Sequence, residues 1–172
     1  MSHPDIALYG RTGSGKTTVA EAFVREYGYV HRKTGAACRA LCLDLFGSEN
    51  KALMNKVTDA LREIDPAVWL RAALRQEDAG YLGPIVLDSV RFWPDYQYVV
   101  ERSFVTIRVT APPDDRAGRL SLRGQSFDLL SDDLHPAEIE LATANFDFEI
   151  DNATTISDLL DQVRRVARAL GL

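Results

Sequence analysis

The sequence predicts an α/β domain of three layers, in which a largely parallel sheet is covered by helices on both faces. Short β-rich runs alternate along the chain with longer helical stretches, and helices rather than tight hairpin turns separate the runs. Parallel strands need crossover connections of this kind. A length of 172 residues with 46% hydrophobic residues is typical of one folded domain, which we expect over residues 1–172.

The order of these elements is read from hydrophobic periodicity. The first expected helix runs from Lys16 to about Tyr27, where Gly28 can end it in the left-handed conformation. The clearest helix begins after Thr155, which can form a capping box with Asp158. Its apolar stripe comprises Ile156, Leu159, Leu160, Val163, Val166 and Leu170. The expected strands are Ile6–Tyr9, Tyr29–His31, Ile85–Leu87, Phe104–Val109 and Phe146–Ile150.

The composition argues against several classes of protein. A formal net charge of -5 argues against a dedicated nucleic-acid or anionic-membrane binder. The sequence has no apolar run long enough to span a bilayer and no signal-peptide core before Gly10. Cys38 and Cys42 are its two cysteines, and we expect both to be reduced thiols. We therefore expect a cytoplasmic protein that binds small molecules, with no nucleic-acid or membrane partner.

The segment after the first expected strand matches the phosphate-binding pattern GxxxxGK[ST]. Glycines let the backbone wrap an anion, successive N–H groups point inward, and the following helix adds its positive end. We expect Lys16 to reach the β- and γ-phosphates and the Thr17 hydroxyl to ligate Mg²⁺. Arg11 could either contact phosphate or project into solvent, and Thr18 could contact the α-phosphate or simply cap the helix. The complete expected set is Gly10, Arg11, Thr12, Gly13, Ser14, Gly15, Lys16, Thr17 and Thr18.

Such a loop serves kinases, GTPases and motor ATPases alike, so other features must separate these classes. The nearest match to the guanine-reading NKxD segment, Asn55–Asp59, has one residue too many and lies in a helical pattern. A DxxG switch is also missing from the sequence. The chain is short for the sensor elements and lid subdomain of a motor ATPase. A small phosphotransferase conflicts with the fewest of these observations.

A second candidate element lies at the end of the third expected strand. The apolar run Ile85–Leu87 is followed by Asp88, whose carboxylate could hold Mg²⁺ near the phosphate loop. Arg91, three residues later, could grip the phosphate of an acceptor. The alternative is an aspartate that caps the next helix beside a surface arginine.

Four segments of the chain together resemble a known family. Residues Asp88–Asp95 are similar to the D-x-R-F-P-N-E signature of phage-type deoxynucleoside monophosphate kinases, which belong to the P-loop nucleoside monophosphate kinase superfamily. Arg62–Trp69 is similar to the R-x-I-D-P-x-x-W segment of that family. His135–Glu138 and Phe146–Asn152 resemble its H-x-S-E stretch and its terminal strand ending in I-D-N. Two departures, Asp95 for a glutamate and Ala137 for a serine, bear on base or sugar selectivity more than on the reaction.

The resemblance implies a P-loop kinase fold with a five-stranded parallel sheet, an acceptor-binding helical region at about 33–80 and a lid at about 112–135. It also implies transfer of the γ-phosphate of ATP, with Mg²⁺, to a deoxynucleoside 5'-monophosphate. One alternative is a dephospho-CoA kinase or another small-molecule kinase of the same superfamily. Another is a nucleotide-binding regulatory protein that has lost turnover. Whether the chain forms a homodimer stays open.

Arginines are the candidate ligands for the acceptor phosphate, because their forked guanidinium binds phosphate oxygens in pairs and stays charged. The candidates are Arg39, which we expect to begin a helix after the second strand, Arg62 and Arg91. The resemblance favours Arg62 and Arg91. Arg39 could equally be a solvated helix residue. Phe92 is the expected base contact, whereas Trp69 is expected to pack in the core.

Three further arginines follow the fourth expected strand. Arg116, Arg119 and Arg123 recur at spacings of three and four, which places them on one face of a helix in the expected lid. We expect at least one of them to act in catalysis with Lys16 and Asp88. The alternative is a solvated face with ion pairs to nearby aspartates. His31 and His135 have no partner at a telling spacing, so no catalytic role is expected for either.

Overall fold

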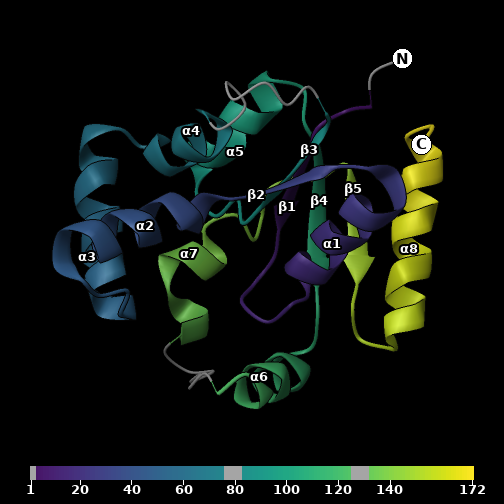
Figure 1. Cartoon of the computed structure of the whole chain (residues 1–172). Coiled ribbons are helices and arrows are strands. Elements are labelled where there is room, and N and C mark those ends of the chain that lie inside the picture. Colours follow the sequence, from purple (N-terminus) through teal and green to yellow (C-terminus); the bar gives the residue numbers. More distant parts are fainter. Residues whose placement is uncertain (1–2, 76–82, 125–131) are drawn as a thin grey trace.

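A five-stranded parallel sheet forms the centre of the computed structural model, which describes residues 3–75, 83–124 and 132–172 (Figure 1). Every neighbouring pair of strands runs parallel, in the order β2-β3-β1-β4-β5. The predicted α/β class with a parallel sheet and flanking helices is therefore confirmed. The strands are β1 (Ile6–Tyr9), β2 (Val30–Lys33), β3 (Ile85–Asp88), β4 (Val105–Thr110) and β5 (Phe148–Asp151).

Three strands begin one or two residues later than predicted. Tyr29, Phe104 and Phe146 precede their strands instead of opening them. Their side chains pack in or against the core, and Phe146 stacks on Tyr9 with ring centroids 5.1 Å apart. Hydrophobicity alone therefore placed these aromatic residues in the strands, although they lie just outside the ladders.

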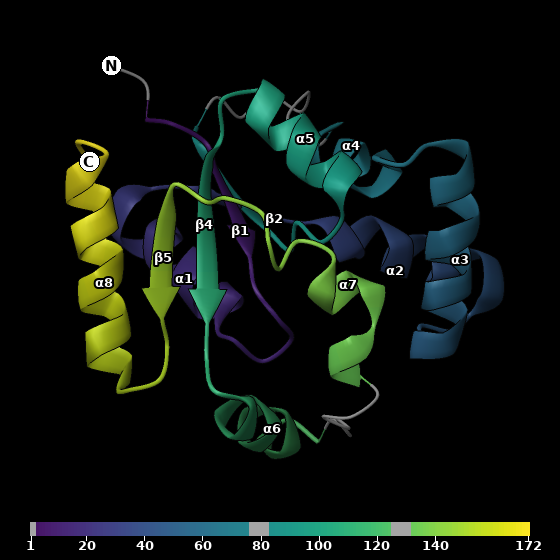
Figure 2. The ribbon, with the colours of Figure 1, turned by 180° about the vertical axis from the view of Figure 1, so that it is seen from behind.

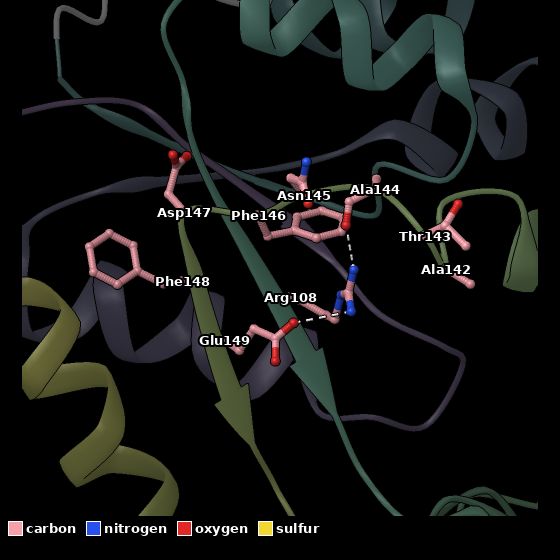
Figure 3. Close-up of a pocket in the computed structure, with 9 residues that line it drawn as sticks. All are labelled: Arg108, Ala142, Thr143, Ala144, Asn145, Phe146, Asp147, Phe148 and Glu149. Carbon is pink, nitrogen blue, oxygen red and sulfur yellow. Dashed lines mark hydrogen bonds and ion pairs between the residues drawn. The ribbon is translucent and has the colours of Figure 1, made fainter.

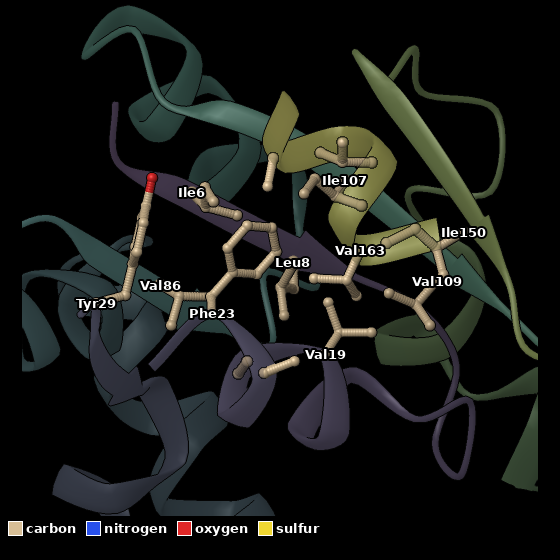
Figure 4. Packing of buried hydrophobic residues seen from close by; sticks show 14 of the residues in the cluster. Ile6, Leu8, Val19, Phe23, Tyr29, Val86, Ile107, Val109, Ile150 and Val163 are labelled. Atoms are coloured by element: carbon tan, nitrogen blue, oxygen red, sulfur yellow. The ribbon is translucent and has the colours of Figure 1, made fainter. Parts of the chain in front are cut away.

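Helices cover both faces of the sheet (Figures 1 and 2). Alternation along β1 sends Ile6 and Leu8 to one face and Ala7 and Tyr9 to the other. The first face packs against α1 (Lys16–Tyr27) and α8 (Ile156–Ala169). The second packs against α4 (Val68–Leu74) and α5 (Trp93–Glu101). Figure 4 shows the first cluster, which includes Ile6, Leu8, Val19, Phe23, Tyr29, Val86, Ile107, Val109, Ile150 and Val163.

The signals predicted for the end of α1 and for the start of α8 are both present. Gly28 ends α1 in the left-handed conformation, with a φ of 71°. Thr155 and Asp158 form the predicted capping box, in which each side chain accepts a hydrogen bond from the other residue's backbone N–H. These local signals set where α1 ends and where α8 begins.

Two helices lie beyond the β2 edge of the sheet, α2 (Thr34–Phe46) and α3 (Lys51–Ile64) (Figure 1). They pack with α4 around Cys38, Cys42 and Trp69, all of which are buried. Trp69 therefore packs as predicted, and both cysteines are free thiols. These helices belong to the expected acceptor-binding region at 33–80, of which residues 76–80 lie outside the described part of the chain.

Another group of short elements lies near the carboxyl ends of the strands. Helix α6 (Pro113–Leu122) lies beyond the ends of β4 and β5 (Figure 2), and is followed by η2 (Asp132–Leu134) and α7 (Pro136–Ile139). The expected lid at 112–135 covers α6 and η2, but its residues 125–131 lie outside the described part. Within the described residues, no helix is long and apolar enough to cross a membrane.

Candidate active site

The loop between β1 and α1 is packed so closely that its backbone leaves no room for side chains at two positions. A Cβ atom on Gly10 would lie 2.2 Å from the carbonyl oxygen of Val109 at the end of β4. A Cβ atom on Gly15 would lie 2.3 Å from Nδ2 of Asn152, just after β5. Gly15 also has a φ of 104° as the N-cap of α1, which favours glycine. The carboxyl ends of β4 and β5 thus hold the loop at the start of α1, as a phosphate cradle requires.

Lys16 folds back over this loop. Its Nζ atom donates to the carbonyl oxygens of Gly10 at 2.6 Å and Arg11 at 3.1 Å. The side chain is buried, and burial together with the charge of Arg91 lowers its pKa to about 8, although Asp88 opposes the shift. A phosphate group bound in the loop would supply the negative charge that restores the pKa of this ammonium group.

Asp88 and Thr17, the two expected metal ligands, are in direct contact. The Thr17 hydroxyl donates to Oδ2 of Asp88 at 2.9 Å, and the Ser89 hydroxyl donates to Oδ1 at 2.9 Å. Burial alone would raise the pKa of Asp88, but the hydrogen bond from His31 and the charge of Lys16 outweigh it and hold the pKa at about 2. The carboxylate is therefore ionised at neutral pH.

This pair of groups fits Mg²⁺, which prefers hard oxygen ligands and binds through few protein groups together with nucleotide phosphates. In the part of the chain that the structure describes, no group of three or more His, Cys, Asp or Glu side chains could hold a metal. Phosphate oxygens and water would have to complete the coordination around Thr17 and Asp88.

His31 is a site residue without a predicted role. Its Nε2 atom lies 3.3 Å from Oδ2 of Asp88, because β2 pairs with β3 and places the two side chains at the same edge of the sheet. Fifty-seven residues separate them in the sequence. Strand pairing, rather than sequence spacing, brings the histidine to the carboxylate.

A cleft of about 680 Å³ extends from the loop toward α2 and α3. Three of the four expected acceptor residues, Arg62, Arg91 and Phe92, line it. Arg39 does not line it, because it lies in the middle of α2 rather than at its start, and its largely exposed side chain pairs with Glu49 at 3.3 Å. Other lining residues include Thr12, Thr34, Gly35, Cys38, Met54, Asn55, Thr58, Asp59, Trp69, Ser89 and Glu138.

Arg62 is held inside this cleft by contacts within the protein. Its Nη2 atom lies 2.8 Å from Oδ2 of Asp95, which is fully buried at 0% exposure. Its guanidinium carbon lies 4.3 Å from the centroid of the Phe92 ring, and Nη1 also donates to the carbonyl oxygen of Pro66. Burial raises the pKa of Asp95 more than Arg62 lowers it. Arg62 therefore compensates a buried carboxylate, and its acceptor role stays a prediction.

Two of the three lid arginines face the phosphate loop. Arg116 is 1% exposed and pairs with both carboxylate oxygens of Asp133, at 2.7 and 2.5 Å. Arg119 donates to the carbonyl oxygens of Asn152 at 2.8 Å and Gly13 at 3.4 Å. Arg123 is exposed at the end of α6. The alternative of a solvated face is therefore wrong for Arg116, while the catalytic roles of all three stay predictions.

Glu138 is a second site residue that had no predicted role. It accepts hydrogen bonds from the backbone N–H of Thr12 at 2.6 Å, from the Thr12 hydroxyl at 2.7 Å and from Nη1 of Arg91 at 2.5 Å. Asp133 nearby accepts from Arg11 at 2.9 Å as well as from Arg116. The sequence shows His135–Glu138 only as a motif, because nothing in it pairs Glu138 or Asp133 with particular arginines.

A separate hollow of about 400 Å³ lies near the start of β5 (Figure 3). Arg108 crosses it, donating to the carbonyl oxygen of Ala144 and pairing with Glu149 at 3.1 Å. No residue of the phosphate loop lines this hollow. It is therefore distinct from the cleft that opens on the loop.

Comparison with known proteins identifies the family of the chain. A family model described as an AAA domain matches residues 6–134. A "Putative deoxynucleotide monophosphate kinase" of Acanthamoeba polyphaga mimivirus is 24% identical over 197 residues, which covers 92% of this chain and 93% of that protein.

A shorter match is to a cytidylate kinase of Caldicellulosiruptor saccharolyticus, 35% identical over 65 residues. This match covers 38% of the chain and spans only 28% of the length of that relative. A crystal structure of shikimate kinase from Bacteroides thetaiotaomicron aligns with a TM-score of 0.59 at 17% identity, covering 99% of this chain and 100% of the other. At that identity the likeness shows a shared fold.

Proposed function

The chain belongs to the AAA domain family, and we propose that it is a P-loop kinase that transfers the γ-phosphate of ATP to a deoxynucleoside 5'-monophosphate and produces the diphosphate. The observation that carries the proposal is the cleft of about 680 Å³ that runs from Thr12 of the phosphate loop past Arg91 and Arg62. The cleft suits a phosphate acceptor, since Arg91 and Arg62 both line it. The likeness to the mimivirus protein adds support.

In this reaction an oxygen of the acceptor phosphate attacks the γ-phosphorus. A new P–O bond forms while the bond to the β–γ bridging oxygen breaks, and ADP leaves. The attacking oxygen needs no general base, because the acceptor phosphate is already anionic at neutral pH. Catalysis then depends on positioning the two anions and compensating their charge.

The side chains of the site suit these tasks. Lys16 and the backbone N–H groups at the start of α1 would bind the β- and γ-phosphates, and Arg91 would hold the acceptor phosphate. Arg119, which contacts Gly13 and Asn152, would add positive charge beside the loop. Thr17 and Asp88 would hold Mg²⁺, which supplies charge neutralisation and orients the phosphates when bound.

A coupled kinase assay with Mg²⁺-ATP against ribo- and deoxynucleoside monophosphates and dephospho-CoA tests the proposal. We expect turnover with at least one deoxynucleoside monophosphate, and no turnover in Lys16→Ala with an unchanged circular dichroism spectrum. Phosphorylation of dephospho-CoA alone would favour the small-molecule kinase alternative. ATP-dependent stabilisation without phosphorylation of any acceptor would favour a regulatory binding protein. Normal turnover in Lys16→Ala would refute the proposed site.

A further inference from the structure

Glu138 joins two parts of the candidate active site that lie far apart in the sequence. One carboxylate oxygen, Oε1, contacts both the Thr12 hydroxyl at 2.7 Å and Nη1 of Arg91 at 2.5 Å. The other, Oε2, accepts from the Thr12 backbone N–H at 2.6 Å. Thr12 belongs to the phosphate loop and Arg91 to the acceptor side of the cleft. A single side chain thus bridges the donor and acceptor sides.

The bridge is buried and charged. Glu138 is 6% exposed, and burial alone would raise its pKa. The positive charge of Arg91 and the hydrogen bonds from Thr12 outweigh burial and lower the pKa below its ordinary value. The group is therefore ionised at neutral pH, and its partners are charge-assisted hydrogen-bond donors.

The backbone of Glu138 is also held in place. Its carbonyl oxygen accepts from the Tyr9 hydroxyl at 3.1 Å in a buried contact, which fastens α7 to the end of β1. The ring of His135 caps α7 by accepting from the Ala137 N–H at 3.2 Å. A carboxylate on such a fixed backbone can set the position of a flexible arginine, because few of its own rotamers keep the three contacts.

We propose that Glu138 is a positioning residue that orients Arg91 toward the acceptor and fixes the distance between the acceptor phosphate and the phosphate loop. The inference rests on the proposed function, since it takes Arg91 as the ligand of the acceptor phosphate. Glu138 itself does not touch the transferred group. Its three donors are all protein groups, so its effect passes through Arg91 and Thr12.

Two substitutions and a matched control test this role. Glu138→Gln keeps the size of the side chain but removes the charge opposite Arg91. Glu138→Asp keeps the charge, but its chain is one carbon shorter and cannot span both partners. Glu101→Gln makes the same chemical change at an exposed position on the last turn of α5. Melting temperatures show whether each variant folds. If Glu138→Gln does not fold, Glu138→Asp serves as the test variant.

The kinetic readout separates positioning from a general structural effect. With the best acceptor from the kinase assay, we expect kcat/KM for the acceptor to fall by about 10- to 100-fold in both Glu138 variants, as for loss of a charged hydrogen bond. The dissociation constant of ATP should stay within about threefold, because Lys16 and most loop N–H groups are untouched. Glu101→Gln should match the wild type. An unchanged acceptor kcat/KM, or ATP binding weakened as much as the acceptor constants, would overturn the proposal.

A double-mutant cycle asks whether Glu138 acts through Arg91. If it does, Arg91→Ala combined with Glu138→Gln should be no more than about twofold worse than Arg91→Ala alone. Effects that multiply would overturn the proposal even if both single variants are impaired. A wild-type chain that phosphorylates no acceptor would refute the proposed function and this role together. An active wild type whose Glu138 variants behave normally would refute this role alone.

Discussion

Replacement of Arg62 by alanine should destabilise the protein strongly, whatever its role toward the acceptor. The substitution leaves the carboxylate of Asp95, at 0% exposure, without the guanidinium that lies 2.8 Å away. Breaking one side of a buried ion pair costs about 3–5 kcal/mol. For a chain of this length such a loss lowers the Tm by roughly 6–20 °C. Urea unfolding followed by circular dichroism measures the free energy directly.

The sign of the pH dependence identifies the cause of this loss. Burial already raises the pKa of Asp95 in the folded protein, and removal of Arg62 should raise it further. A carboxyl whose folded pKa is raised favours folding only while it is protonated, so its stability contribution is lost as pH rises through that pKa. The deficit of Arg62→Ala should therefore be smaller at about pH 5 than at about pH 8.

Two comparisons make the reasoning refutable. Arg39→Ala removes an arginine with a 61% exposed side chain and should cost at most about 1 kcal/mol, as surface pairs do. Adding Asp95→Asn to Arg62→Ala removes the uncompensated charge and should recover about 1 kcal/mol or more. If Arg62→Ala loses no more stability than Arg39→Ala, Asp95 does not depend on Arg62 for its burial.

Three other outcomes are expected. Gly15→Ala should lower the free energy of unfolding by about 2 kcal/mol or more and abolish ATP binding, because the left-handed backbone and the Asn152 amide, 2.3 Å from the new Cβ, both oppose the substitution. Its control is Gly118→Ala at an exposed helical position, which should raise the free energy of unfolding by about 0.5–1 kcal/mol in the same urea unfolding experiment. Asp88, with a pKa of about 2, should stabilise the folded protein by about 2 kcal/mol at pH values above the pKa of this group in the unfolded state. That contribution should be lost as pH falls from about 4 to about 2, and an Asp88→Asn variant with the same acid-unfolding profile would contradict it. Lys16, with a pKa of about 8, should take up a proton when ATP binds at about pH 9 and not at about pH 6. Calorimetry in buffers of different ionisation enthalpy measures this uptake, and equal heats at the higher pH would contradict it.

Local patterns carried most of the correct predictions. The phosphate loop, the start of α1 and the capping box of α8 each depend on residues within a few positions of one another, so their spacing in the sequence is also their spacing in space. Strand boundaries were less accurate, because a buried aromatic residue such as Phe146 has the hydrophobicity of a strand residue while lying outside the ladder. The predicted acceptor role of Arg39 depended on its placement at the start of a helix, whereas α2 begins at Thr34.

The sequence by itself determined the fold class, the position of the phosphate loop and the set of charged residues available to a phosphotransfer site. Only the tertiary structure decided which of these charges meet. The order β2-β3-β1-β4-β5 brings His31 to Asp88, and the packing of α7 brings Glu138 to Thr12, 126 residues away, and to Arg91. An arginine is chemically able to pair with any carboxylate within reach, so its partner is chosen by strand pairing and helix packing rather than by a sequence pattern.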